Sequence, residues 1–376
     1  MIVFIALKLL LLISLVLSGY NLSKRTTKGK YYYPYWITVM PVIVTYTLVE
    51  GLRYARATDY FSYFNSFLGL IYIDFEPVFA LFVYVLSTLN APFYTGFLFC
   101  SFFLIYTGGL LIKEFRFVGL FALPLFYLDT IVQSSNLVRM YVALSFVFLA
   151  LRYLLQNKSY KVILFFVLAF FTHYSTIVLV PFVYLFHKYQ NPFKSRLVIL
   201  VLYVLALNVS IGAEFVNEYL IRLKGFGIYE NLLGSTDRWL IGDNIDTIEN
   251  NFSLFYYIRF YVTPICLIWL GYPFIHKYKR YKYNVFYHLY VVGALLIPMA
   301  LTLPTELFYR LCLYFLSFKF IILSFILYEY FNKSSKFNFM SKAFIFIIFL
   351  DSIYLLVKTI VNYSTELGYQ FVWDKI

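Results

Sequence analysis

Long apolar runs separated by short polar segments make up the chain from end to end. A helix that crosses a bilayer needs about 20 mostly apolar residues. Runs of this kind predict spans at residues 2–20, 35–52, 93–112, 138–155, 197–213, 256–275, 285–303, 311–330 and 343–361, with weaker candidates at 76–89, 117–132 and 162–187. The pattern therefore predicts an all-α, polytopic membrane helix bundle of about 10–12 transmembrane segments, forming a single domain over residues 1–376.

The composition excludes most other classes of protein. Of the 376 residues, 62% are hydrophobic and 13% are charged, whereas a soluble domain carries about 25% charged residues. A soluble enzyme, a disordered chain and a secreted disulfide scaffold are therefore excluded. The net charge of +13 does not indicate a nucleic-acid partner, because the basic residues lie in short loops between apolar runs. The three cysteines lie inside apolar runs without metal-ligand spacing, so no metal and no cofactor are expected.

Loop charge predicts how the chain is oriented in the bilayer. Five loops contain Lys and Arg but no acid, and we expect them in the cytoplasm: 21–34, 152–161, 187–196, 276–284 and 331–342. Most of the 18 acidic residues lie in segments expected outside: 53–76, 214–259, 304–310 and 362–376. In the first run the basic cluster follows the apolar residues, which is the reverse of a signal peptide. We expect a retained first helix with its N-terminus outside.

Two apolar segments do not fit this alternation. Segment 76–89 is too short for a full crossing, and we expect it to enter the outer leaflet and return. Segment 162–187 has basic flanks on both sides, which predicts two short helices broken around Thr172–Tyr174; the alternative is one long tilted helix. Broken helices are tolerated only where they line protein or a watery cavity, so they suggest a site. The segment 214–255, about 45 residues rich in Gly and acids, is predicted to be an external loop.

Charges at or within a membrane are costly, so they are the first candidates for function. The segment from Gly51 to Tyr63 places an acid between cations and phenols at the outer surface. The other candidates are Glu76 at the start of the short segment, Arg139 at the start of an apolar helix, His173 at the predicted break, and the pair Glu306 and Arg310.

Each candidate also has a structural interpretation. Asp59 can form a local ion pair in a solvated loop, and Glu76 before a proline is a common helix-terminus signal. A lone His is often a hydrogen-bonded core residue, and Glu306 and Arg310 can pair with each other. Arg139 at a helix start opposes the helix dipole, which favours an anionic partner. Because nucleotide-binding motifs and His/Cys metal clusters are absent from the sequence, chemistry driven by nucleotides on the inner side is not expected.

Four short motifs, in order, resemble those of the EpsG family of Wzy-type polysaccharide polymerases. They are Gly51-Leu-Arg-Tyr with Asp59-Tyr60-x-x-Tyr63, Phe75-Glu76-Pro77, Asn136-x-x-Arg139-x-x-x-Ala143 and Leu168-Ala169-x-x-x-His173-x-Ser175. Glu306-x-x-x-Arg310 lies where the family often has an arginine-bearing segment. The chain departs from the pattern at Ala57, Val78 and Met140, where the family tends to have Gly, Gly and Gln.

The resemblance implies a glycosyltransferase-type polymerase in the bacterial cytoplasmic (inner) membrane. It would act at the outer face on oligosaccharide repeat units carried by a polyprenyl diphosphate. A sugar hydroxyl of one unit attacks the anomeric carbon of another chain, and lipid diphosphate leaves. The expected partners are this lipid-linked oligosaccharide, the bilayer and, in the cell, a chain-length regulator and a flippase. The product would be an O-antigen, a capsule or an exopolysaccharide.

The roles expected for the candidate residues follow from this chemistry. Asp59 orients the acceptor or acts as the base, with Glu76 as its rival, and His173 is a base or orients the cavity. Arginines fork onto phosphate oxygens, so Arg139 and Arg310 are expected to clamp the diphosphate. The predicted substrate-binding residues are Arg53, Arg56, Tyr60, Tyr63, Arg139, Trp239, Glu306 and Arg310.

Other classes of function stay open at this point. A lipid-linked oligosaccharide flippase would have matched halves and cavity charges facing both sides. A glycosyltransferase that uses a lipid-linked sugar, or a ligase, would share the outer-face chemistry. An accessory membrane protein without catalysis would tolerate replacement of every polar candidate.

Overall fold

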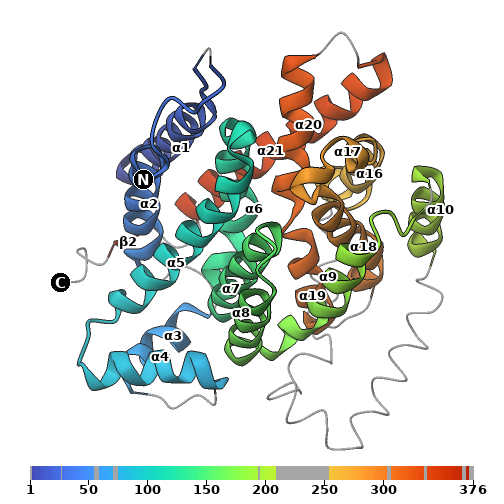
Figure 1. The fold of residues 1–376 in the computed structure, drawn as a ribbon. Helices are drawn as coiled ribbons and strands as arrows, with labels where there is room; N and C mark the ends of the chain where they lie inside the picture. The colour runs from blue at the N-terminus through green and yellow to red at the C-terminus, as the bar shows by residue number, and fades with distance from the viewer. Residues whose placement is uncertain are drawn as a thin grey trace, which may run out of the picture. The chain divides into compact units, whose positions relative to one another are not determined.

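The computed structural model describes residues 2–26, 28–54, 59–70, 75–193, 195–208, 254–302, 306–333, 337–365 and 370–371. Over these residues the chain is almost entirely helical (Figure 1). Within the same residues, five helical stretches are long and apolar enough to cross a membrane: Ile5–Ser23, Tyr94–Ile131, Val138–Leu155, Tyr309–Asn332 and Phe339–Val357. The second and the fourth of these stretches each run through more than one of the helices named below. Shorter apolar helices accompany them. The predicted class, a polytopic helical membrane protein, is confirmed.

The chain divides into two compact units. The first contains Met1–Val180, Leu323–Tyr328 and Leu355–Ile376, and the second contains Pro181–Ile322 and Glu329–Tyr354. The predicted external loop, 214–255, lies outside the described residues except for its last two, which begin a helix.

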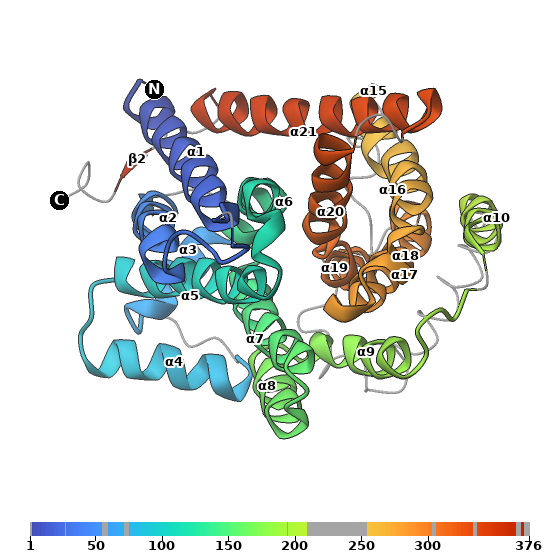
Figure 2. The same ribbon diagram turned by 45° about the horizontal axis from the view of Figure 1, so that its top comes forward.

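The first unit contains most of the helices that carry candidate residues. Its elements are α1 (Ile2–Ser23), α2 (Tyr35–Gly51), β1 (Arg53–Tyr54), α3 (Tyr60–Phe67), α4 (Pro77–Thr88), α5 (Tyr94–Ile112), η1 (Lys113–Val118), α6 (Gly119–Asn136), α7 (Val138–Leu155), α8 (Ser159–Thr172) and η2 (Tyr174–Val178), with the strand β2 (Gln370–Phe371). The two strands form a minimal antiparallel sheet in which Arg53 pairs with Phe371. Helices α7 and α8 lie side by side, and α1 packs on both α2 and α6 (Figures 1 and 2).

Helices α1 and α6 approach closely because both carry glycine at the contact. A Cβ atom on Gly19 would lie 2.6 Å from the backbone oxygen of Gly119, and one on Gly119 would lie 2.9 Å from the side chain of Leu22. Small residues let helix backbones approach in membranes, where lipid supplies no hydrophobic drive for helices to associate. The glycines therefore fix the distance between these two helices.

A buried ion pair joins α1 to α2 within this packing. The ammonium group of Lys8 contacts Oε1 of Glu50, and both side chains are almost completely buried. The hydroxyl of Tyr127, on α6, donates to the same oxygen at 3.3 Å. Buried charges are retained only when they are paired and hydrogen-bonded, so the three helices depend on one another at this point.

The second unit contains α9 (Leu179–Lys188), α10 (Arg196–Leu207), α15 (Leu254–Tyr257), η3 (Ile258–Val262), α16 (Thr263–Gly271), α17 (Phe274–Lys277), η4 (Lys279–Tyr281), α18 (Tyr283–Thr302) and α19 (Glu306–Leu316). The first two residues of α9 belong to the first unit. Two further helices, α20 (Lys319–Asn332) and α21 (Phe339–Thr365), have residues in both units. The segment η3 is a π-helical turn between α15 and α16. From this turn Arg259 reaches the fully buried Asp351 at 3.0 Å, and Lys319 contacts the other carboxylate oxygen at 3.3 Å. The second unit therefore also encloses a paired charge.

The Lys8–Glu50 pair gives a first testable expectation. Replacing Lys8 by Met leaves the Glu50 carboxylate buried without its cation, which costs about 3–5 kcal/mol. We expect a clear fall in the melting temperature of the detergent-purified protein. The three buried free cysteines allow a thiol-reactive dye to follow unfolding. The double variant Lys8→Met/Glu50→Gln removes both charges and should recover most of the loss.

The matched control is Lys24→Met, which changes an exposed lysine after the end of the same helix. It should melt like the wild type. Equal melting temperatures for Lys8→Met and the wild type would show that this pair does not hold the helices together.

Candidate active site

Glu76 is held at the start of α4 by the proline that follows it. Pro77 occupies the first helical turn, where its missing N–H is not needed. The residue before a proline is restricted to extended conformations, and Glu76 has φ −59° and ψ 150°. Its side chain therefore leaves the chain at a fixed point, just before the short apolar helix begins.

His173 lies at a break between two helices, as the sequence predicts. Helix α8 ends at Thr172, His173 is extended with φ −159° and ψ 110°, and the short helix η2 follows. The His173 amide still donates to the carbonyl of Ala169 at 2.9 Å. The hydroxyl of Thr176 donates to the His173 carbonyl at 3.0 Å. These bonds satisfy the broken backbone and fix the position of the imidazole.

Arg139 lies in the first turn of α7. Leu137, with φ −91° and ψ 55°, separates this helix from α6. The positive end of the helix dipole disfavours a cation here unless an anion lies close to it. Nη1 of Arg139 donates to Oε2 of Glu76 at 2.8 Å, which provides that anion.

The carboxylate of Glu76 joins three segments of the chain. Its Oε2 accepts from Arg139, and its Oε1 lies 2.7 Å from Nδ1 of His173. The partners are 63 and 97 residues away along the sequence. The Glu76 side chain is 9% exposed, whereas those of Arg139 and His173 are 26% and 19% exposed. The carboxylate is therefore the covered centre of a cluster whose two partners reach the surface.

This environment sets the ionisation of Glu76. Burial by itself raises the pKa of the carboxyl group, but the hydrogen bond to His173 and the charge of Arg139 outweigh it and lower the pKa to about 2. Glu76 therefore stays ionised at neutral pH, and its charge lies against both Arg139 and His173.

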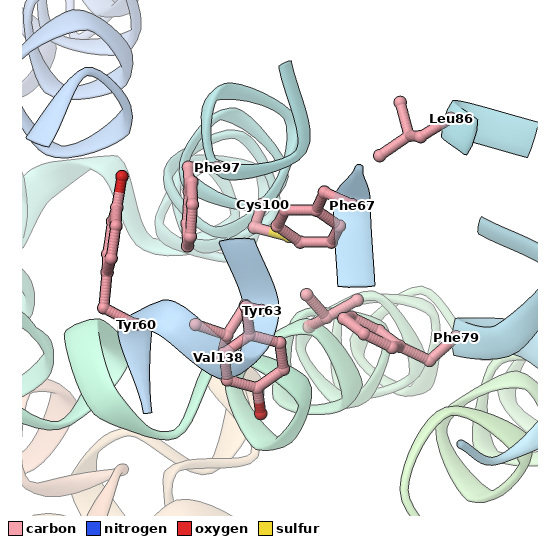
Figure 3. Packing of buried hydrophobic residues seen from close by; sticks show 9 residues of the cluster. Tyr60, Tyr63, Phe67, Phe79, Leu86, Phe97, Cys100 and Val138 are labelled. Carbon is pink, nitrogen blue, oxygen red and sulfur yellow. The ribbon is translucent and has the colours of Figure 1, made fainter. Parts of the chain in front are cut away.

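Aromatic rings surround the charged cluster on one side. The guanidinium of Arg139 lies 4.9 Å from the centroid of the Phe75 ring, and Phe75 stacks on Tyr63. Tyr63 also interacts through its hydroxyl with Arg139, and burial raises the pKa of this phenol, so it stays protonated. Figure 3 shows the Tyr63 hydroxyl directed out of the apolar cluster formed by α3, α4, α5 and the start of α7.

Tyr60 belongs to the packing of this cluster. Its ring is fully buried and stacks on Phe97 at 4.6 Å between centroids, with an angle of 5° between the planes (Figure 3). A Cβ atom on Gly96 would lie 2.6 Å from the ring of Phe67, so α5 can approach α3 only with glycine at this position. The structure thus places Tyr63 beside the charged residues and Tyr60 inside the aromatic layer that supports it.

Asp59 lies close to the same group through its backbone. It precedes α3, and its amide donates to Oδ1 of Asn136 at 3.1 Å. Asn136 ends α6, three residues before Arg139. Sequence reasoning did not predict this contact, although Asn136 is part of the motif that contains Arg139. The contact ties the Asp59 segment to the junction of α6 and α7.

Arg53 lies in a second, more buried network. Its guanidinium donates to the carbonyl of Glu50 and, at 3.5 Å, to that of Ser135, and it lies 5.1 Å from the Phe97 ring centroid. With Tyr46 and Glu50 it lines a cavity of about 10 Å³, roughly the space of one water molecule. Arg53 thus links the ends of α2 and α6 beneath the aromatic layer.

The remaining predicted residues lie elsewhere. Arg56 and Trp239 lie outside the described residues, as does the side chain of Glu306. Arg310 is in α19 and belongs to the second unit. Among the described residues, His, Cys, Asp and Glu form no group of three that could hold a metal ion.

The pKa of Glu76 gives a pH-dependent expectation. A carboxyl group whose pKa is lowered on folding contributes stability above its ordinary pKa of 4.5, and this contribution is lost as the pH falls toward about 2. The melting temperature of the wild type should therefore fall more between pH 7 and pH 3 than that of Glu76→Gln. Equal falls in the two proteins would contradict the pairing described here.

Comparison with known proteins places these observations in a family. The profile of the EpsG family matches residues 36–371, which is nearly the whole chain and includes every motif that converges on Glu76. No curated protein and no solved structure gives a significant match. The chain therefore belongs to the EpsG family, a family of Wzy-like polysaccharide polymerases.

Proposed function

We propose that this protein polymerises oligosaccharide repeat units carried by a polyprenyl diphosphate, at the outer face of the bacterial cytoplasmic membrane. The observation that carries the proposal is the cluster of Glu76, Arg139 and His173. It combines a candidate base with a cation suited to phosphate, at the ends of apolar helices. Both groups are needed when a sugar hydroxyl displaces a lipid diphosphate.

His173 is the proposed base. If Nδ1 carries the proton that it donates to Glu76, the opposite nitrogen Nε2 holds the basic lone pair. The acceptor hydroxyl loses its proton to Nε2 as its oxygen forms a bond to the anomeric carbon of the donor. The bond from that carbon to the diphosphate oxygen breaks, and the lipid diphosphate leaves with the electron pair. The proton then passes from His173 to water or to the departing phosphate.

Arg139 is the proposed contact to the diphosphate. A guanidinium has five N–H donors in a fixed fork, and the bond to Glu76 uses a donor on Nη1. The side chain is partly exposed, so its outer edge can face a phosphate group. Glu76 holds the guanidinium in one orientation, and such preorganisation makes a charge effective in stabilising a leaving group.

Asp59 is proposed to orient the acceptor sugar. Its amide is fixed by Asn136 at the junction that begins the Arg139 helix. Glu76, with a pKa of about 2, is a weak base, so we assign it to positioning His173 and Arg139. Arg310, the other arginine expected from the sequence to bind the diphosphate, lies in α19.

Arg139→Ala tests the assignment of the leaving group. Loss of a charge that stabilises the transition state should slow polymerisation at least about 100-fold, and the ladder of surface polysaccharide on a gel should collapse toward single repeat units. Arg139→Lys keeps the charge but loses the planar fork, so partial chain extension is expected. The measurement is ladder length in the deletion host at equal protein level.

Arg152→Ala is the matched control. Arg152 lies at the other end of α7 and pairs with Glu114 at 3.1 Å, as Arg139 pairs with Glu76. It should support a full ladder. A full ladder from Arg139→Ala as well would refute the assignment. Loss of even the single unit from the outer face would instead indicate a flippase or a transferase.

His173 and Glu76 are expected to act as one unit. His173→Ala should slow chain extension by the purified protein by about 100- to 10,000-fold, the usual contribution of a general base. Glu76→Gln should also slow it, and the double variant should be no slower than His173→Ala alone, because residues that act together are not additive. Additive losses in the double variant would separate the two roles and contradict the proposal.

A further inference from the structure

The second unit contains a cleft that the polymerase chemistry does not use. It has a volume of about 360 Å³, within the range of small-molecule sites. Residues from five helices and the turns beside them line it: Arg196, Trp269, Leu270, Pro273, Phe274, Lys277, Glu329, Lys333, Phe337, Asn338 and Ser341. They come from the start of α10, the ends of α16, α17 and α20, and the start of α21.

The charges of the cleft favour an anion. Three cations, Arg196, Lys277 and Lys333, face one carboxylate, that of Glu329. Lys277 pairs with this carboxylate, and the hydroxyl of Tyr278 donates to it. The acid is therefore matched within the protein, and a net positive charge remains at the opening.

Arg196 lies over an aromatic ring. Its guanidinium carbon is 3.8 Å from the centroid of the Trp269 ring. This contact fixes the plane of the guanidinium, so its edge can donate two parallel hydrogen bonds to phosphate oxygens. Trp, like Tyr, is enriched at the level of lipid headgroups.

Apolar side chains continue from the cleft along the same elements. Leu197 follows Arg196, and Phe339 and Met340 lie between the lining residues Asn338 and Ser341. All three are exposed, Phe339 to 87%. These side chains offer a surface on which acyl chains can pack directly beside the charged cleft, so a ligand with both a phosphate and acyl chains fits the two parts together.

The cleft also joins the loops expected on one side of the membrane. Arg196, Lys277 and Lys333 come from the basic segments 187–196, 276–284 and 331–342. The positive-inside pattern places all three in the cytoplasm. Basic pockets between transmembrane helices on this side are suited to anionic lipid headgroups.

We propose that this cleft binds the phosphate headgroup of an anionic phospholipid from the cytoplasmic leaflet. Arg196 and Lys333 hold the phosphate, Trp269 orients Arg196, and the acyl chains lie along Leu197, Phe339 and Met340. None of the lining residues is proposed to take part in polymerisation, so the proposal is tested by binding alone.

The test is a lipid titration of the full-length, detergent-purified protein, followed by native mass spectrometry. The probes are palmitoyl-oleoyl phosphatidylglycerol and the zwitterionic phosphatidylcholine with the same chains. We expect saturable binding of phosphatidylglycerol, and about tenfold or greater weakening in Arg196→Gln/Lys333→Gln, which removes two charges near the headgroup. Phosphatidylcholine should bind more weakly to the wild type.

Two further variants separate binding from folding. Lys279→Gln/Arg280→Gln removes two exposed basic residues from the neighbouring turn, outside the cleft, and should bind like the wild type. Lys333→Gln alone changes an exposed side chain and should give part of the loss. Equal affinity for the two lipids, or unchanged phosphatidylglycerol binding in the double variant of Arg196 and Lys333, would overturn the proposal. Displacement of the lipid by an equal concentration of inorganic phosphate would assign the cleft to free phosphate and also overturn it.

Discussion

One carboxylate, that of Glu76, accepts hydrogen bonds from two directions and thereby fixes the ends of three helices. Without a partner, an ionised acid that is 9% exposed would carry a large desolvation cost. Arg139 at 2.8 Å and His173 at 2.7 Å remove that cost, and each is oriented in return. The start of α4, the start of α7 and the end of α8 are therefore held by the same interaction. The aromatic layer of α3, α4 and α5 supports it, because Phe75 and Tyr63 both contact Arg139.

Two other buried acids, Glu50 and Asp351, are also paired with cations. Lys8 with Glu50, and Asp351 with Arg259 and Lys319, link helices within one unit, and their acids are 5% exposed or less. The Lys8–Glu50 pair is enclosed on both sides, whereas Arg259 and Lys319 are 22% and 16% exposed, much like the partners of Glu76. The partners of Glu76 differ in their position, because Arg139 lies at a helix start and His173 at a break between helices. Irregular backbone at membrane depth is tolerated only where it lines protein or a water-filled space, so the breaks and the exposed charges indicate the same location.

Much of this arrangement follows from local sequence. Apolar runs predict the helices, the basic flanks of 162–187 predict the break at His173, and a cation that opposes the helix dipole predicts an anion near Arg139. The identity of that anion is a matter of packing, because Glu76 is 63 residues away. The Lys8–Glu50 pair was not predicted, because each residue alone is one charge in or beside an apolar run. Arg53 lies within the first motif, and only the structure shows that its guanidinium donates to the backbone carbonyls of Glu50 and Ser135.

The separation of Glu76 from His173 has a consequence for how the protein is made. The ribosome adds about 5–20 residues each second, and His173 comes 97 residues after Glu76. The carboxylate therefore waits about 5–20 s for its second partner after it has been synthesised, and Arg139 arrives first. Until His173 is made, the acid at the start of α4 has at most one of its two partners. The cluster is therefore complete only after α8 and the break that follows it have been synthesised.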